Sequence, residues 1–533
     1  MKNRIFQKTW LLFKPRNYSS PTDAYYLRVC NDVKKRLLKW SDVPLFMENL
    51  SEGDLDQLCC FLVCYFEDII SQTNLWRTFT RKHEELYGKK IPFYNAKDYL
   101  EDEINKEDVS FLIWYYLNTI NGERFIHPYH LLLIDASAKV MEVLDEEYEY
   151  APENTSLKSY YVIPETEKDF YRTRMVMDNI LLKSYLFMDA QTSLRDKEEE
   201  IVKSKNRETL LNYLNENRDG FLHSYCTSLL GFRAKEWAAY LLGKDHPLYN
   251  DLLAISEKIS GTFFYKSQDA THIHLEHIAS EKVFKLTKAS FDHGDNLDEK
   301  DLIIYISIIQ WRKEWWFSGV FVKLGFNADL ILDEKNSMES RRSVAFLDQD
   351  TSHLKESIQL HYRAFLKFNN NSMVAFLPSA KINSFIAEYV QYYNQSLNKP
   401  QQDHDEAVKH ARAKGFRFGE DKQKVDFESM SSSGLIFFNI KTGVPEIAID
   451  INSAFPDEEN PFFDAQKSDA HLWHLLTAEY FSADLAFYCL NRYKEKLPFF
   501  KNPSNKYFLK DIDFLLRFWK KGNFYSKTGL TSI

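Results

Sequence analysis

Histidine and glutamate residues alternate between positions 272 and 276 in a pattern that could bind a metal ion. His272, His274 and Glu276 are separated by Ile273 and Leu275, as on a β-strand whose two faces differ. Imidazole and carboxylate groups are common ligands of divalent metals, and side chains on one face of a strand can converge on one ion. The pattern therefore predicts a candidate divalent-metal site. The alternative, a solvated polar face, is the commoner origin of such a pattern.

Two other histidine groups are less specific. Asp292, His293 and Asp295 lie in the sequence FDHGDN, which a turn rich in Asx and glycine explains without any chemistry. His471 and His474 are three residues apart near the start of an expected helix. No glutamate follows His471, so the pattern is not the H-E-x-x-H of zinc proteases, and a structural role is favoured.

Acidic and cysteine clusters complete the candidate ligands. The acidic cluster could bind Mg²⁺ or Ca²⁺, but it lacks the central glycine of an EF-hand loop, and an acidic surface loop explains it. It consists of Asp450, Asn452, Asp457, Glu458 and Glu459. Cys59, Cys60 and Cys64 lie in an apolar helical stretch without C-x-x-C spacing, which favours core packing of reduced thiols. The sequence has no Walker A, dinucleotide-binding or nucleophile-elbow motif.

Four aromatic residues crowd one short segment: Trp311, Trp315, Trp316 and Phe317. Rings that do not fit inside a small domain would form a binding surface for a peptide, a base or a partner domain. The alternative is packing against flanking helical regions.

The histidines and the aromatic residues belong to one segment of short β-type runs. Turn residues separate Thr262–Lys266, His272–Ile278, Val283–Thr287, Leu302–Trp311 and Trp315–Lys323. Five strands in so short a segment predict a small SH3-like or OB-like β-barrel over residues 258–325. Its interior candidates are Ile273, Leu275, Phe284, Leu286, Ile304, Ile306 and Ile308.

The remaining chain predicts an α+β, multi-domain protein with a mainly helical N-terminal half. Residues 1–150 read as a helical bundle and residues 151–257 as a second helical region. The run Phe111–Leu117, with Asp108 as its cap, is apolar on nearly every side and predicts a buried central helix.

Residues 326–533 predict a mixed α+β domain. It should contain a strand at Met373–Leu377, a hairpin of Leu435–Asn439 and Glu446–Ile451, a long helix from Ser468 and a last helix at Ile512–Trp519. Residues 400–430 are polar and predict a loop or a mobile helix.

Composition limits the classes of function. The 533 residues carry a formal charge of −9, which disfavours a general nucleic-acid binder. No run of about 18 apolar residues and no signal-peptide pattern is present, so we expect a cytoplasmic protein without a membrane span. Six cysteines in a chain of this length indicate free thiols in a reducing compartment.

Several segments together resemble an uncharacterised bacterial family, a domain of unknown function. They are LCCFLVCYFEDII, EDVSFLIWYYL, AKEWAAYLLGKDHPLY, ASEKVFKLTKASFDHG, WRKEWWFSGVF, IDINSAFPDEENPFF and DIDFLLRFWKK. The resemblance implies a bacterial, cytoplasmic protein with one co-inherited architecture. It implies no activity, cofactor or site residue.

The sequence leaves three functions open. The leading hypothesis is a non-catalytic binding or scaffold protein that docks a protein partner through the barrel and needs no cofactor. The second is a metal-dependent hydrolase centred on the His272 and His274 strand. The third is a nucleic-acid-associated protein that uses the barrel, which the net charge disfavours.

Overall fold

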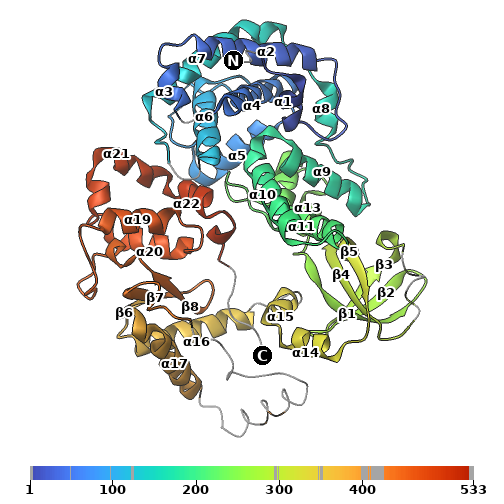
Figure 1. The fold of residues 1–533 in the computed structure, drawn as a ribbon, viewed down its shortest axis with the longest axis vertical. Coiled ribbons are helices and arrows are strands. Elements are labelled where there is room, and N and C mark those ends of the chain that lie inside the picture. The colour runs from blue at the N-terminus through green and yellow to red at the C-terminus, as the bar shows by residue number, and fades with distance from the viewer. Residues whose placement is uncertain are drawn as a thin grey trace. The chain divides into compact units, whose positions relative to one another are not determined.

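The computed structural model describes residues 4–48, 50–95, 98–121, 125–292, 294, 297, 299–345, 347, 352–397, 406, 409 and 425–526 (Figure 1). The chain divides into two compact units, Met1–Ser256 and Glu257–Ile533. His293, Asp295 and most of the polar segment expected at residues 400–430 lie outside the described residues. The finer division of the chain into four domains stays a prediction.

The first unit is helical throughout its described part. Helices α2, α4, α6 and α7 pack on one another, and α9 to α13 follow them along the chain. The helices are α1 (Gln7–Trp10), α2 (Asp23–Leu38), α3 (Val43–Met47), α4 (Glu52–Ser71), α5 (Leu75–Tyr87), α6 (Lys106–Ile120), α7 (Leu131–Glu147), α8 (Thr155–Ser159), α9 (Phe170–Lys183), α10 (Met188–Ser204), α11 (Leu210–Ser224), α12 (Ala234–Leu242) and α13 (Tyr249–Leu253), with 3-10 turns η1 (Leu11–Phe13) and η3 (Tyr185–Phe187).

Helix α6 is the buried central helix that the sequence predicts, because its side chains from Val109 to Leu117 are all buried. The prediction that Asp108 caps it is wrong. The helix already begins at Lys106, so Asp108 lies inside the first turn and accepts hydrogen bonds from Tyr65 Oη (2.8 Å) and Trp76 Nε1 (2.9 Å). Burial raises the pKa of Asp108 to about 7. Asp108 thus joins α6 to α4 through Tyr65 and to α5 through Trp76.

A buried ion pair attaches the start of the chain to α4. Lys14 contacts Glu67, and their side chains are 2% and 0% exposed. Asn154 Nδ2 also donates to Glu67 Oε1 (2.8 Å), and the Lys14 ammonium lies 3.8 Å from the centre of the Trp10 ring. The segment that follows η1 is therefore fixed on the core of the unit.

Residues 259–324 of the second unit form a closed five-stranded barrel, as the sequence predicts. Its strands are β1 (Ile259–Gln268), β2 (His272–His277), β3 (Val283–Thr287), β4 (Ile303–Trp311) and β5 (Glu314–Leu324). Their order is β1-β2-β3-β5-β4, closed by the β1–β4 pair. All pairs are antiparallel except β3–β5, which meets only at Leu286 and Trp315. This order, with its one parallel pair, is that of an OB-like barrel.

The barrel core contains all seven side chains predicted for its interior. Val344 of α15 (Met338–Ala345) belongs to the same core. On β4 the side chains that alternate with the interior ones are buried as well, among them Ile303 and Ile309. The outer side chains of β2 are partly buried, and the exposed strand residues of the barrel lie on β3 and near the ends of β1 and β5.

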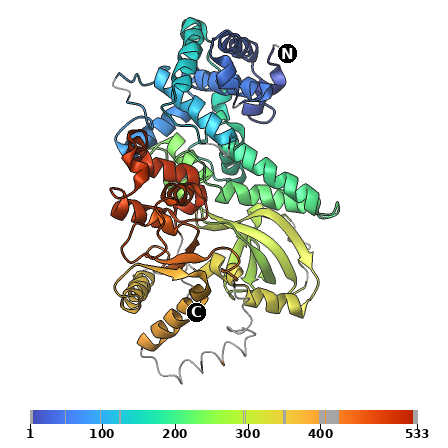
Figure 2. The ribbon, with the colours of Figure 1, turned by 60° about the vertical axis from the view of Figure 1, so that its left-hand side comes forward.

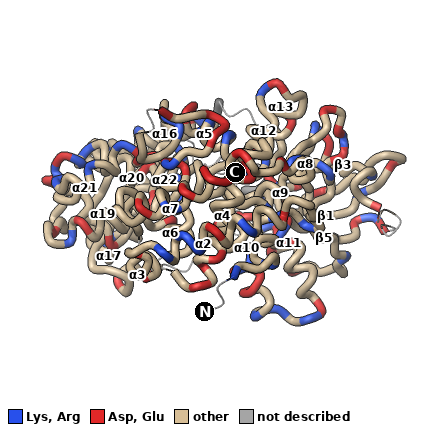
Figure 3. The backbone as a smooth tube through the Cα atoms, turned by 90° about the horizontal axis from the view of Figure 1, so that it is seen from above, with Lys and Arg blue, Asp and Glu red and all other residues tan. Residues whose placement is uncertain are grey.

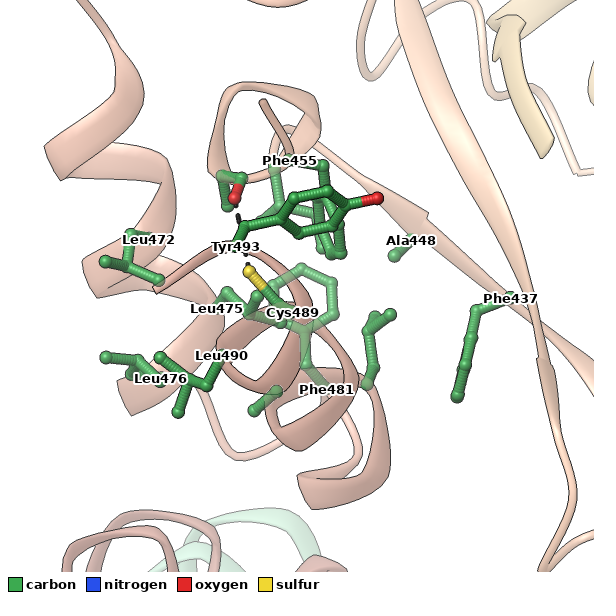
Figure 4. Packing of buried hydrophobic residues seen from close by; sticks show 14 of the residues in the cluster. Phe437, Ala448, Phe455, Leu472, Leu475, Leu476, Phe481, Cys489, Leu490 and Tyr493 are labelled. Atoms are coloured by element: carbon green, nitrogen blue, oxygen red, sulfur yellow. Dashed lines mark hydrogen bonds between the residues drawn. The ribbon is translucent and has the colours of Figure 1, made fainter. Parts of the chain in front are cut away.

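A three-stranded antiparallel sheet organises the rest of the second unit, and helices cover both of its faces (Figure 2). On β7, Leu435 and Phe437 belong to one core, shown in Figure 4, while Ile436 and Phe438 belong to the other. The elements are α14 (Ala328–Asn336), α16 (Ser352–Phe368), β6 (Val374–Pro378), α17 (Ser379–Ser396), β7 (Ser433–Asn439), β8 (Val444–Ile449), α19 (Ser468–Thr477), α20 (Ala483–Tyr493), α21 (Pro503–Lys506) and α22 (Ile512–Lys520). The predicted strand and hairpin are confirmed.

The long helix predicted from Ser468 is two helices, α19 and α20. Lys520 Nζ, from α22, donates to the carbonyl oxygens of Leu475 (2.8 Å) and Ala478 (3.0 Å). The buried ammonium thus satisfies carbonyl groups at the end of α19, where the chain leaves the helix. Sequence periodicity could not predict this helix end, because the lysine that binds its carbonyl oxygens is distant in sequence.

All six cysteines are free and buried, as expected for thiols that fill apolar cores. Among the described residues, no helix is both long enough and apolar enough to cross a bilayer.

We expect Trp114→Ala to lower the free energy of unfolding by about 3–5 kcal/mol, because it leaves a large cavity in the core. Trp114 is fully buried, and its Nε1 donates to the carbonyl oxygen of Ile126 (2.9 Å). The control is Tyr150→Ala, at a side chain that is 74% exposed, which should change stability by no more than about 0.5 kcal/mol. Calorimetric unfolding of both variants is the measurement. Equal stability of the two variants would contradict the buried position of α6.

Candidate functional site

Strand β2 separates its side chains between the inside and the outside of the barrel. Ile273 and Leu275 are fully buried in the core. His272 and His274 lie on the outer face with side chains 27% and 24% exposed, and Glu276 follows at 27%. The predicted sharing of one face by these three residues is therefore confirmed.

Each of the three outer side chains has a different partner. His272 Nε2 lies 3.0 Å from Glu314 Oε2, at the start of β5. His274 Nε2 lies 3.1 Å from Asp269 Oδ2, in the turn between β1 and β2. Glu276 lies 3.6 Å from the Lys266 ammonium. Among the residues that the structure describes, no group of three histidine, cysteine or acidic side chains is arranged to hold a metal ion.

Asp269 shapes the turn that precedes β2. Its Oδ1 accepts from the backbone nitrogens of Thr271 (2.7 Å) and His272 (2.8 Å). These backbone hydrogen bonds, with help from His274, hold the pKa of Asp269 well below its usual range. Asp269 is therefore ionised at neutral pH and places a negative charge beside the outer face of β2.

The third histidine of β2, His277, is an interior residue that the motif at residues 272 to 276 did not reveal. His277 is fully buried, and its Nδ1 lies 2.9 Å from Ser280 Oγ. Its ring packs 5.0 Å from Phe263, and burial lowers its pKa to about 4. His277 is thus a neutral core residue at neutral pH. The signal was available, because position 277 continues the inward alternation of 273 and 275.

The aromatic residues of the barrel do not share one exposed face. Trp311 is 1% exposed. Trp315 and Phe317 pack on the barrel core, with ring centres 4.9 Å from Phe284 and 5.5 Å from Phe291. Trp316 is half-buried and alternates with these inward rings along β5. Most of the predicted aromatic surface therefore serves packing, because the barrel interior needs large side chains.

The candidate ligands in the C-terminal part bind structural partners. His471 Nδ1 accepts from the backbone nitrogen of Ser453 (3.1 Å), and burial lowers the pKa of this histidine. His474 hydrogen-bonds Tyr480 instead. Asp457 lies 3.4 Å from Arg492. These groups order the loops around α19 and α20.

The outer side chains of β2 and their neighbours form a polar surface on the barrel, which we call the β2 face. Lys285 lies opposite His274 across the β2–β3 pair and is exposed, and Val283 beside it is 54% exposed. The β2 face comprises Lys266, Asp269, His272, His274, Glu276, Val283, Lys285, Lys300, Asp301 and Glu314. It thus carries four carboxylates against three lysines.

A family model described as a protein of unknown function, DUF3843, matches residues 4–282, just over half of the chain. The chain belongs to the DUF3843 family. The match includes the whole described part of the first unit and the first two strands of the barrel. Three of the seven segments that carry the resemblance, from WRKEWWFSGVF onward, lie wholly beyond the DUF3843 match, and ASEKVFKLTKASFDHG lies mostly beyond it. No curated protein and no solved structure matches the chain.

We expect the double change of His272 and His274 to alanine to alter the free energy of unfolding by no more than about 0.5 kcal/mol, because exposed ion pairs contribute little. Leu275→Ala, on the opposite face of the same strand, should cost about 2–5 kcal/mol. Chemical unfolding measures both, and elemental analysis of the wild type gives its metal content. A bound divalent metal that the double change removes, with a matching loss of stability, would restore the metal hypothesis.

Proposed function

We propose that this protein is a non-catalytic cytoplasmic binding protein that docks a basic segment of a protein partner on the β2 face. The excess of four carboxylates over three lysines on that face carries the proposal. Charges of both signs are interspersed along the described chain (Figure 3), so a local excess on one exposed surface can select a partner of opposite charge.

The geometry of the β2 face suits docking better than catalysis. His272 and His274 pair with two separate carboxylates on an outer strand face, where Glu314 and Asp269 are 53% and 52% exposed. Catalysis by charged groups depends on a preorganised site from which water is excluded. Exposed ion pairs, in contrast, exchange readily for pairs with a partner, since each contributes at most about 1 kcal/mol.

The same face favours a protein over a nucleic acid. An excess of carboxylates repels phosphate groups, whereas it attracts lysine and arginine side chains. Strand β2 is paired on both edges, with β1 and with β3, so recognition on its outer face has to use side chains. Val283, 54% exposed among the charges, offers the apolar contact that the centre of a protein interface needs.

A fluorescent lysine-rich peptide tests the proposal, with anisotropy measured on the full chain at low and high salt. The wild type should bind it at low salt and release it at high salt. Glu276→Gln with Glu314→Gln should weaken binding about five-fold, the effect expected from losing two exposed charges.

The matched control is Glu458→Gln with Glu459→Gln, at two exposed carboxylates outside the barrel. This control should leave the affinity unchanged. Equal binding by the two double variants, or no binding by the wild type, would overturn the docking role of the β2 face.

A further inference from the structure

Positive side chains gather around a cavity of about 280 Å³ within the first unit. Residues of η1, α4, α9, α10 and α11 line it, and its cations are Arg16, Lys183, Arg195 and Arg218. Among the described residues that line the cavity, Glu198 is the only carboxylate. Such a concentration of positive charge contrasts with the net negative charge of the whole chain.

Lys183 is the cation that most needs an anion. It is the last residue of α9 and is half-buried, and within the described part of the chain no carboxylate lies within 4.0 Å of its ammonium. Burial, together with the charges of Arg16 and Arg218, lowers the pKa of Lys183, and the carboxylates of Asp178 and Glu198 oppose this shift only in part. A half-buried ammonium that faces other cations is unfavourable unless an anion neutralises it.

Arg218 is held in place by the carboxylate of Asp178. Its Nη2 donates to both oxygens of Asp178, each at 2.9 Å. A guanidinium has five N–H groups, so this contact leaves the hydrogens of Nη1 and Nε for another acceptor. Arg218 is 24% exposed, which means that little rotamer freedom is lost when it binds.

Helix α10 adds polar side chains at the same place. It begins at Met188, and Gln191 and Thr192 line the cavity. Gln191 Nε2 donates to the carbonyl oxygen of Ser184 (2.9 Å), which leaves the Gln191 carbonyl and the Thr192 hydroxyl for a ligand. The rest of the lining is apolar and consists of Leu12, Phe13, Leu182, Met188 and Leu194.

We infer that this cavity binds a small phosphate-bearing organic ligand, with the phosphate against Lys183 and Arg218 and the organic part against the apolar wall. Four cations face three carboxylates: Glu198 in the lining, Asp178 paired with Arg218, and Asp196, 3.7 Å from Arg195. The remaining positive charge attracts an anion, and the oxygens of a phosphate monoester can accept from Lys183 and Arg218 together. A simple carboxylate offers fewer acceptor oxygens and less charge.

Phenyl phosphate is a suitable probe because it joins a phosphate to an apolar ring, and benzoate is its carboxylate counterpart. Calorimetric titration of the full chain at constant ionic strength should show binding of phenyl phosphate. Benzoate should bind about ten-fold more weakly, because charge-assisted hydrogen bonds to a dianion are stronger and more numerous.

Lys183→Gln should weaken the binding of phenyl phosphate by about ten-fold or more, since it removes the half-buried charge. The matched control is Lys203→Gln, at an exposed lysine on α10 that does not line the cavity. It should bind as the wild type does. Equal weakening in both variants would reveal general attraction to surface charge and overturn the inference, as would the absence of binding to the wild type at millimolar concentrations.

Lysine acylation of the wild type gives a second test that needs no variant. Phenyl phosphate should slow the modification of Lys183, read by mass spectrometry, and leave the modification of Lys203 unchanged. Unchanged modification of Lys183 at a saturating concentration would place the ligand elsewhere and overturn the inference. The docking role of the β2 face would be unaffected, because that face belongs to the other unit.

Discussion

The buried ion pair of Lys14 and Glu67 is the interaction on which the first unit depends. Both side chains are almost completely buried, and burial alone opposes charge on Lys14, yet the negative groups around it hold its pKa above the usual value. Separating the pair would leave a buried charge without a partner, at a cost of several kcal/mol. The segment around Lys14 is therefore held on α4. Phe13 and Arg16 flank Lys14, so the pair also fixes one side of the cationic cavity.

The burial and pairing of three sets of charged side chains explain which of them hold the fold together and which can bind a partner. Lys14 is buried and paired, so it is structural. The histidines of the β2 face are half-buried but paired with exposed carboxylates, and these weak pairs can be exchanged for contacts with a basic partner. Lys183 is half-buried without a carboxylate within 4.0 Å among the described residues, so it favours an incoming anion. Burial and pairing together, more than residue type, distinguish these roles.

Strand alternation and turn residues predicted those parts of the fold that depend on residues close together in the sequence. The alternation at residues 272 to 276 and the turn residues between the β-type runs sufficed to predict the barrel and its interior, because strand side chains alternate with a period of two. The same rule could have placed His277 inside. The parallel β3–β5 closure, the role of Asp108 between Tyr65 and Trp76, and the cavity around Lys183 depend on residues distant in sequence. The spacing of neighbouring residues cannot predict such contacts. A lysine at the end of a helix is common, so Lys183 gave no sign in the sequence that it lines a cavity.

A double-mutant cycle on Lys14 and Glu67 tests the central claim most directly, with the unfolding of each variant followed by calorimetry. Lys14→Met and Glu67→Leu should each cost about 3–5 kcal/mol, because each leaves one buried charge unpaired. The double variant should cost no more than either single variant, since it removes both charges together. Two small and additive costs would contradict the account, because they would show that the pair does not hold the start of the chain on α4.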